Sequence, residues 1–237
     1  MTARDRHDPD VTLPWMREGT AALLATADRL SDDDLRTPST LPGWTRAHVI
    51  GHLARNAEAL VRLADWARTG IPTPMYADRE QRAAEIESSA ALPPAVLRQE
   101  LKSTAAELEH ALATLQPTAW QAEVRSALGR AIPAAEIPWM RVREVWLHAT
   151  DLAAGTTFAA LPAALIDILL DDVTGTLSTR PDCPAVLLCP SDRETTWLLG
   201  PSTAEAAGVV EAPAADLLAW TTGRAPSAAR VRLPRWL

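Results

Sequence analysis

Two short segments, far apart in the chain, carry pairs of potential metal ligands spaced by one helical turn. They are His48 with His52, in HVIGH, and Glu144 with His148, in EVWLH. Residues i and i+4 lie one above the other on the same face of an α-helix. Two such pairs on packed helices can place three or four ligands around one divalent ion. The pattern therefore predicts a helical bundle that holds a mononuclear metal site.

Helix phase separates the two histidines of the first segment. With about 100° between successive residues, His52 falls at the edge of the apolar stripe of its helix, and Asn56 falls between His52 and Val49 of that stripe. His48 falls farther from the stripe. We therefore expect His52 to face the bundle interior and His48 to be more exposed.

The second segment allows two interpretations. Glu144, His148 and Asp151 lie within roughly 60° of one another on a helix that is otherwise largely apolar. They can belong to a metal site, or they can form the solvated face of an amphipathic helix, with His52 as a boundary histidine. The spacing alone leaves both open, because Glu and His are common on helix surfaces and no rule links two segments so far apart.

The composition excludes some classes of partner. The chain has 237 residues, 47% hydrophobic and 22% charged, which is typical of one large or two small globular domains. Its net charge of -7 argues against nucleic acid as a partner. No apolar run approaches the roughly 20 residues of a membrane span, and MTARDRHDPD at the start lacks the apolar core of a signal peptide. We expect a cytoplasmic protein that binds neither nucleic acid nor membrane.

The hydrophobic pattern divides the chain into two parts. Helical periodicity covers residues 12–30, 45–68, 78–89, 94–115 and 134–154, with a capping box at Ser31 and Asp34, an N-cap at Thr45 and a helix end at Gly70. Beyond Gly155 the pattern predicts a helix at 162–178, short strands in PAVLLCPSD, ETTWLLG and AGVVEAP, a helix at 214–222 and an extended basic tail. We predict an all-α domain at residues 1–155 and a small α/β domain at residues 156–237.

The cysteines and tryptophans give weaker signals. Cys183 and Cys189 fit no common zinc motif and are expected to be reduced and buried, so any thiol chemistry should use a thiol from outside the chain. The chain has nine tryptophans, which usually serve packing. Trp44 and Trp146 lie in the two ligand segments and are candidates for the walls of a pocket.

The ligand segments belong to a longer resemblance. From about residue 40 to the C-terminus, the chain resembles the mycothiol-dependent maleylpyruvate isomerases in LPGWTRAHVIGHLARN, WARTGIPTPMY, WMRVREVWLHATDL and PRWL. This resemblance implies an α+β fold, in which a DinB-like four-helix bundle precedes a small α/β domain that closes over the site. It also implies one divalent metal ion, usually zinc, held by His52, Glu144 and His148. Asn56 and Asp151 are candidates for orienting a ligand imidazole, or they are ordinary polar surface.

The resemblance implies cis-trans isomerisation of maleylpyruvate to fumarylpyruvate in gentisate degradation, with mycothiol as the thiol cofactor. A thiolate that adds reversibly to the conjugated alkene leaves a single bond that can rotate, and a metal that binds the sulfur favours the thiolate. The alternatives are a mycothiol-dependent S-transferase on the same scaffold and a non-catalytic metal-binding protein. We expect a monomer whose partners are a small anionic substrate and a low-molecular-weight thiol.

Maleylpyruvate is a dianion, so the site needs cations. The resemblance places Arg82, in REQRAAEI, and Arg224, in WTTGR, near the active site as contacts to the substrate or the thiol cofactor. Arg82 can instead be a solvated helix residue that pairs with Glu85 or Glu87. Arg224 can instead be a surface cation whose charge interacts favourably with the dipole at the C-terminal end of a helix.

Overall fold

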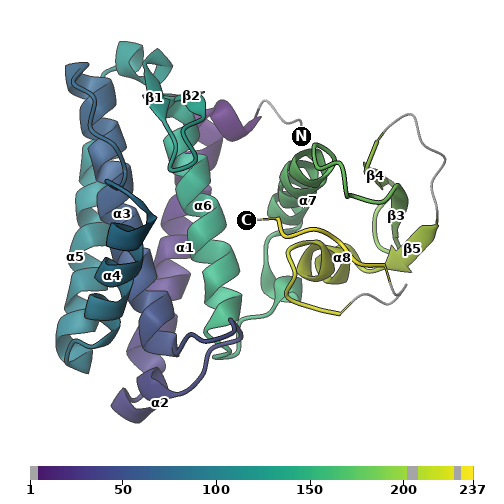
Figure 1. Ribbon diagram of the computed structural model, residues 1–237, viewed down its shortest axis with the longest axis horizontal. Coiled ribbons are helices and arrows are strands. Elements are labelled where there is room, and N and C mark those ends of the chain that lie inside the picture. Colours follow the sequence, from purple (N-terminus) through teal and green to yellow (C-terminus); the bar gives the residue numbers. More distant parts are fainter. Residues whose placement is uncertain (1–4, 202–207, 227–230, 237) are drawn as a thin grey trace. The chain divides into compact units, whose positions relative to one another are not determined.

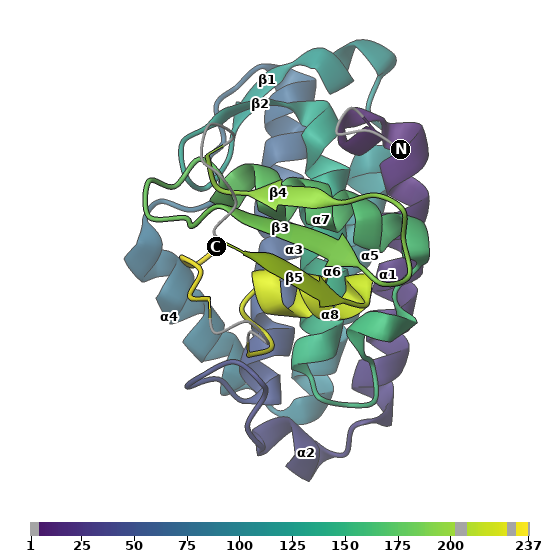
Figure 2. The ribbon, with the colours of Figure 1, turned by 90° about the vertical axis from the view of Figure 1, so that its right-hand side faces the viewer.

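The computed structural model describes residues 5–201, 208–226 and 231–236. These residues form eight α-helices, one two-stranded sheet and one three-stranded sheet, which confirms the predicted α+β class. The chain divides after Thr156 into two compact units. The unit up to Thr156 contains a helical bundle, and the unit that follows contains the three-stranded sheet (Figures 1 and 2).

Four long helices form the bundle of the first unit (Figure 1): α1 (Pro9–Arg29), α3 (Arg46–Thr69), α5 (Pro94–Ala113) and α6 (Ile137–Asp151). α3 packs against both α5 and α6, and α1 packs against the same two helices. α4 (Arg79–Ala90) lies on α3, and α2 (Asp32–Arg36) fills the short connection from α1 to α3. The strands β1 (Glu123–Arg125) and β2 (Ala131–Pro133) pair as an antiparallel hairpin before α6.

The predicted helix boundaries follow local capping chemistry. Ser31 and Asp34 form the expected capping box at the start of α2. Thr45 is the N-cap of α3: its hydroxyl accepts from the backbone N–H of His48, and Nδ1 of His48 accepts from the backbone N–H of Thr45. Gly70 ends α3 in the left-handed conformation, with φ 73°. The predicted start and end of α3 are thus confirmed, and His48 is engaged at the helix terminus.

The end of α6 differs from the prediction. The helix begins after the 3-10 turn Ala134–Glu136 and stops at Asp151, because Ala153 has the left-handed φ of 49°. Arg46, the first residue of α3, donates from Nε to the carbonyl of Leu152 (2.6 Å) and from Nη2 to the carbonyl of Ala153 (3.0 Å). These bonds satisfy carbonyls that the end of a helix leaves without partners. The start of α3 is therefore fixed to the end of α6.

The second unit holds a three-stranded sheet in the order β4-β3-β5 (Figure 2). β3 (Val186–Pro190) runs antiparallel to β4 (Trp197–Leu199) and parallel to β5 (Val209–Ala212). α7 (Ala163–Leu177) packs against α8 (Ala214–Thr221) and β4. Part of the predicted basic tail lies outside the described residues, and residues 231–236 form no helix or strand. Within the described residues, no helix has the length and apolar character needed to cross a membrane.

Gly51 provides a test of the contact between α3 and α4. A Cβ at this position would lie 2.7 Å from Cβ of Ser89 and 3.4 Å from backbone atoms of Ile86 and Ala90. Gly51→Ala should therefore lower the free energy of unfolding by about 1–3 kcal/mol, because α4 must move to make room. Urea unfolding measures this change. The same substitution at Gly175, where a Cβ meets nothing within 4 Å, should be neutral or stabilising by up to about 1 kcal/mol. Equal stability of both variants would contradict the close contact.

Candidate metal centre

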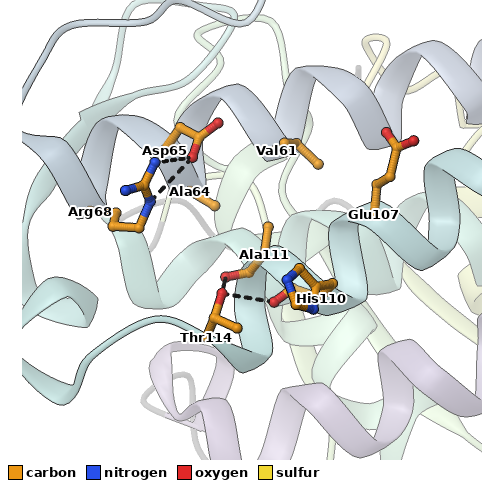
Figure 3. A pocket seen from close by; sticks show the side chains of 8 residues that line it. All are labelled: Val61, Ala64, Asp65, Arg68, Glu107, His110, Ala111 and Thr114. Atoms are coloured by element: carbon orange, nitrogen blue, oxygen red, sulfur yellow. Dashed lines mark hydrogen bonds and ion pairs between the residues drawn. The ribbon is translucent and has the colours of Figure 1, made fainter.

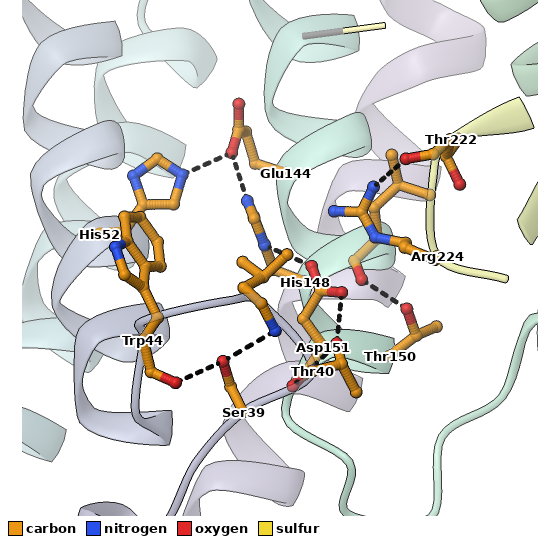
Figure 4. Close-up of polar contacts among 12 residues, drawn as sticks. Ser39, Thr40, Trp44, His52, Glu144, His148, Thr150, Asp151, Thr222 and Arg224 are labelled. Atoms are coloured by element: carbon orange, nitrogen blue, oxygen red, sulfur yellow. Dashed lines mark hydrogen bonds and ion pairs between the residues drawn. The ribbon is translucent and has the colours of Figure 1, made fainter. Parts of the chain in front are cut away.

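The structure brings the three predicted ligands together (Figure 4). His52 comes from α3, whereas Glu144 and His148 come from α6, and one potential ligand atom of each lies within 4.8 Å of the others. Oε2 of Glu144 lies 2.8 Å from Nε2 of His52 and 3.2 Å from Nε2 of His148. The packing of α3 on α6 thus joins segments about 90 residues apart, a proximity that spacing alone left open.

His48 lies outside this cluster, as helix phase predicts. The side chain of His52 is 4% exposed and that of His48 is 18% exposed. Nε2 of His48 lies 3.2 Å from Oε2 of Glu87, and its Nδ1 belongs to the cap of α3. The prediction that His52 faces the interior is confirmed.

Asp151 holds the imidazole of His148 (Figure 4). Its Oδ2 accepts from Nδ1 of His148 at 2.8 Å, and its Oδ1 accepts from the hydroxyl of Thr40 at 2.9 Å. Asp151 is fully buried, so the interpretation of this cluster as a solvated helix face is wrong for this residue. Because a carboxylate can only accept, Nδ1 of His148 carries a hydrogen, and Nε2 of the same ring points toward Glu144. Carboxylates commonly orient metal-binding histidines in this way.

Asn56 hydrogen-bonds to Arg141 and not to a ligand imidazole, the partner considered from the sequence. Its Oδ1 accepts from Nη1 of Arg141 at 2.8 Å, and the same nitrogen donates to the carbonyl of Leu53 at 2.8 Å. Arg141 is 1% exposed, and Nε and Nη2 of Arg141 have no hydrogen-bond partner within the described part of the chain. Burial lowers the pKa of Arg141 to about 10, opposed by Glu144, so the guanidinium remains charged near neutral pH. Arg141 was not predicted from the sequence, although its position three residues before Glu144 on one helix face was a usable signal.

The electrostatics of the cluster favour an ionised Glu144. Burial alone would raise the pKa of Glu144, but the charge of His52 and hydrogen bonds from both histidines hold it well below its usual range. Burial also acts to lower the pKa of His148, yet hydrogen bonds to Asp151 and Glu144 raise it. Burial lowers the pKa of His52 despite the opposing effect of Glu144. The carboxylate therefore lies between a more basic and a less basic imidazole.

The donor set fits a divalent metal ion. A neutral imidazole nitrogen and a carboxylate oxygen both present lone pairs, so they approach one another closely only around a proton or a metal ion. Ligands at about 2.0–2.2 Å from a tetrahedral zinc ion lie roughly 3.3–3.5 Å apart. The 3.2 Å from Oε2 of Glu144 to Nε2 of His148 is close to this separation, whereas the 2.8 Å to Nε2 of His52 is a hydrogen-bond distance. Three protein ligands leave one position for a ligand from outside, as in catalytic zinc sites. His52, Glu144 and His148 are therefore suited to hold such an ion.

Trp44 forms part of the surroundings of this site, whereas Trp146 does not. The Trp44 ring centroid lies 5.5 Å from that of His52, at an interplanar angle of 57°. Trp146 donates from Nε1 to the carbonyl of Trp15 at 3.0 Å, and its ring packs closely against Gly19 of α1. Of the two tryptophans considered as pocket walls, only Trp44 lies against a predicted ligand.

Arg82 reaches the same histidine from α4. Its Nη2 donates to Nδ1 of His52 at 3.3 Å, and its guanidinium carbon lies 5.8 Å from the ring centroid of Tyr76. Arg62 lies 5.9 Å from the same ring, and burial raises the pKa of Tyr76. Tyr76 was not singled out in the sequence, although it ends the TPMY segment of the resemblance.

The alternative pairing of Arg82 with acidic neighbours on α4 does not occur. Oε1 of Glu85 accepts from Gln81 at 3.0 Å, and Oε2 of Glu87 lies 3.2 Å from Nε2 of His48. The structure thus places Arg82 beside a predicted ligand instead of in a solvated ion pair on its own helix.

Arg224 and both cysteines lie in the second unit. Arg224 follows Gly223, which has φ 77°, and its Nη1 donates to the carbonyl of Thr222 at 3.3 Å. Cys183 and Cys189 are free thiols. Cys183 is buried as expected, and burial raises its pKa, whereas Cys189 is only half-buried, which corrects the expectation for that residue. A role for Arg224 at the metal centre stays a prediction.

Two hollows of the first unit lie away from the three ligands. A groove of about 360 Å³ between α3 and α5 (Figure 3) is lined by Val61, Ala64, Asp65, Arg68, Glu107, His110, Ala111 and Thr114. Nη2 of Arg68 donates to Asp65 at 2.9 Å, so this pair is engaged within its own helix. A second hollow of about 590 Å³ includes His48 but none of the three ligands. The cluster in Figure 4 is therefore the stronger candidate site.

The fold and the cluster define a helical-bundle protein with a candidate His-Glu-His metal centre and an attached α/β unit. Residues 16–153 match the model of the "Mycothiol maleylpyruvate isomerase N-terminal domain", and residues 160–234 match that of the "MDMPI C-terminal domain". The chain belongs to the mycothiol maleylpyruvate isomerase family.

Solved structures agree with this membership. The crystal structure of a mycothiol-dependent maleylpyruvate isomerase is 32% identical in sequence, with a TM-score of 0.88 over 100% of this chain and 98% of that chain. The crystal structure of the H52A mutant of a mycothiol-dependent maleylpyruvate isomerase gives the same values. The search of curated proteins returns no match.

Removal of single histidines tests the metal centre. Purified wild-type protein should hold about one divalent ion per chain, and His52→Ala should abolish tight binding, because two protein ligands rarely retain zinc. Elemental analysis after dialysis measures the metal content. His48→Ala is the matched control on the same helix and should leave metal content largely intact. A metal content that follows His48 and ignores His52 would contradict this assignment.

Proposed function

We propose that this protein is a mycothiol-dependent maleylpyruvate isomerase that converts maleylpyruvate to fumarylpyruvate, with one zinc ion held by His52, Glu144 and His148. The observation that supports it best is the convergence of these side chains from two helices in a chain that matches both domains of that family. A divalent ion held there would supply a Lewis acid that favours the deprotonated form of a thiol at neutral pH.

The surrounding residues hold the ligands in place. Asp151 keeps the hydrogen of His148 on Nδ1, and Thr40 holds Asp151 in place. The low pKa of Glu144 keeps it an anionic ligand. Trp44 covers one side of His52. These contacts reduce the freedom of the donor atoms before any ligand binds, which lowers the entropic cost of binding.

Two arginines would bind the carboxylates of the substrate. Arg82 lies beside His52, so it would place a carboxylate near the metal centre. Arg224 would contribute from the second unit, in line with our expectation that the small domain closes over the site. The guanidinium fork suits carboxylates because it donates two parallel hydrogen bonds. We further propose that the protein acts as a monomer in the cytoplasm, within gentisate degradation.

A direct assay tests the proposed function. Maleylpyruvate should be converted to its trans isomer only when mycothiol is present, and the thiol should be recovered unchanged. Consumption of thiol with formation of a conjugate would show an S-transferase instead. Metal binding with neither reaction would show a non-catalytic metal-binding protein.

The proposal that the reacting thiol comes from outside the chain leads to a further prediction. The double variant Cys183→Ser/Cys189→Ser should keep mycothiol-dependent isomerisation, because neither thiol belongs to the proposed machinery and burial raises the pKa of Cys183. Steady-state kinetics of the variant, checked for normal thermal unfolding, measure this. A folded variant without activity would place the nucleophile inside the protein.

The role of Arg224 can be tested in the same assay. Arg224→Ala should lower kcat/KM by at least about tenfold, or roughly 1.4 kcal/mol of transition-state stabilisation, with metal content unchanged. Arg224→Lys should restore activity only in part, because it keeps the charge but loses the fork. Arg180→Ala, at an exposed position of the same unit, is the control. Wild-type kinetics in a folded, metal-loaded Arg224→Ala protein would remove Arg224 from the active site.

A further inference from the structure

Arg141 joins the two helices that carry the predicted metal ligands. It lies on α6 one turn before Glu144, on the face that also carries His148. Its Nη1 donates to the carbonyl of Leu53 and to Oδ1 of Asn56 on α3, at 2.8 Å each. Arg141 is 1% exposed, so these bonds lie inside the bundle. One side chain of α6 is therefore fixed to two residues of α3.

The Arg141 contact is the neighbour of the ligand contact along the same two helices. On α3, Asn56 follows His52 by one turn, and on α6, Arg141 precedes Glu144 by one turn. The two contacts thus form successive rows between antiparallel helices. A slip of α3 past α6 by one residue would displace each row by about 1.5 Å, whereas metal–ligand distances tolerate only about 0.2 Å. The Arg141 row therefore opposes the displacement to which a set of ligands from two helices is most sensitive.

Neither stability nor charge accounts for a guanidinium at this place. Nε and Nη2 of Arg141 have no hydrogen-bond partner among the described residues, so the cost of burying the group is only partly offset. Apolar side chains of similar volume often replace buried charges without loss of stability. A buried cation near Glu144, whose charge opposes the effect of burial on the pKa of Arg141, also repels a divalent ion. What an apolar chain or a bare charge lacks is the direction of the hydrogen bonds to α3.

We propose that Arg141 is a positioning residue of the metal centre, which fixes α3 against α6 through Leu53 and Asn56 and thereby sets the affinity for the ion. Arg141 binds neither the ion nor the substrate in this role. It holds the backbone that carries His52 in register with the turn of α6 that carries Glu144, in addition to the apolar packing of the two helices. This inference rests on the metal site proposed above.

Zinc affinity of the full-length protein, measured by competition with a chromogenic chelator, tests the inference. Arg141→Met, a long apolar side chain without donors, should weaken Zn²⁺ binding by at least about tenfold. Urea unfolding in the presence of EDTA should show that its stability equals or exceeds that of the wild type. Arg141→Lys keeps the charge but loses the fork, so it should restore the affinity only in part. Adding Asn56→Leu to Arg141→Met should cause little further loss, because both substitutions remove the same contact.

Arg98→Met is the matched control. Arg98 of α5 donates to the carbonyls of Ala27 and Leu30 at the end of α1, so it forms a comparable bond between two helices that carry none of the three ligands. Its loss should lower stability and leave Zn²⁺ affinity at the wild-type value. The visible spectrum of the Co²⁺-loaded protein reports the geometry of the ligands. This spectrum should change in Arg141→Met and stay unchanged in Arg98→Met.

The outcomes separate positioning from the other roles that Arg141 could have. Tighter Zn²⁺ binding by Arg141→Met would show that its charge alone matters, and wild-type binding by Arg141→Met or by Arg141→Lys would show that the directed bonds do not set the affinity. An equal loss of affinity in Arg141→Met and Arg98→Met would show a merely structural role. Each of these results would overturn the inference while leaving the metal site intact. No Zn²⁺ binding by the wild type would overturn the metal site and this inference together.

Discussion

The candidate site depends on one packing contact, that of α3 against α6. Neither helix carries a full set of ligands, so the register of the two helices sets the distances within the cluster. Polar bonds fix that register at two levels: Arg46 binds carbonyls at the end of α6, and Arg141 reaches across to Leu53 and Asn56 of α3. Apolar packing supplies most of the stabilisation, but it tolerates small shifts that directional hydrogen bonds do not.

The interior of the bundle contains charges that a purely structural core would not keep. Arg141 and Asp151 are almost completely buried, and Glu144 is only partly exposed. Buried charges of this kind often stabilise a protein less than well-packed apolar side chains of the same volume. These charged residues lie within one helical turn of Glu144 and His148. Such a concentration of buried charge is expected at a binding site and not in a purely structural core. Among the described residues, Nε and Nη2 of Arg141 have no hydrogen-bond partner, and the guanidinium carbons of Arg62 and Arg82 lie 5.9 Å and 5.8 Å from the ring centroid of Tyr76.

Periodicity and capping rules predicted the parts of the site that depend on one helix at a time. The capping residues, the inward direction of His52, and the shared face of Glu144, His148 and Asp151 all follow from helix geometry. Contacts between helices were accessible only through resemblance, because no local pattern records which turns of two helices meet. Resemblance placed Arg82 near the active site, whereas neither resemblance nor periodicity pointed to the bond of Asn56 to Arg141. Arg82 in particular is positioned by the irregular connection between α3 and α4, whose path cannot be calculated from periodicity.

The unequal surroundings of the two histidines suit a centre that must accept several ligands from outside. His148 is held by a chain of bonds through Asp151 to Thr40 and cannot turn without breaking them. His52 is contacted at Nδ1 by Arg82, a long side chain from α4. One ligand is therefore fixed by a buried carboxylate, while the other lies next to a cation. An arrangement with two rigid, carboxylate-bound histidines would bind metal well but would leave no cation next to it for an anionic substrate.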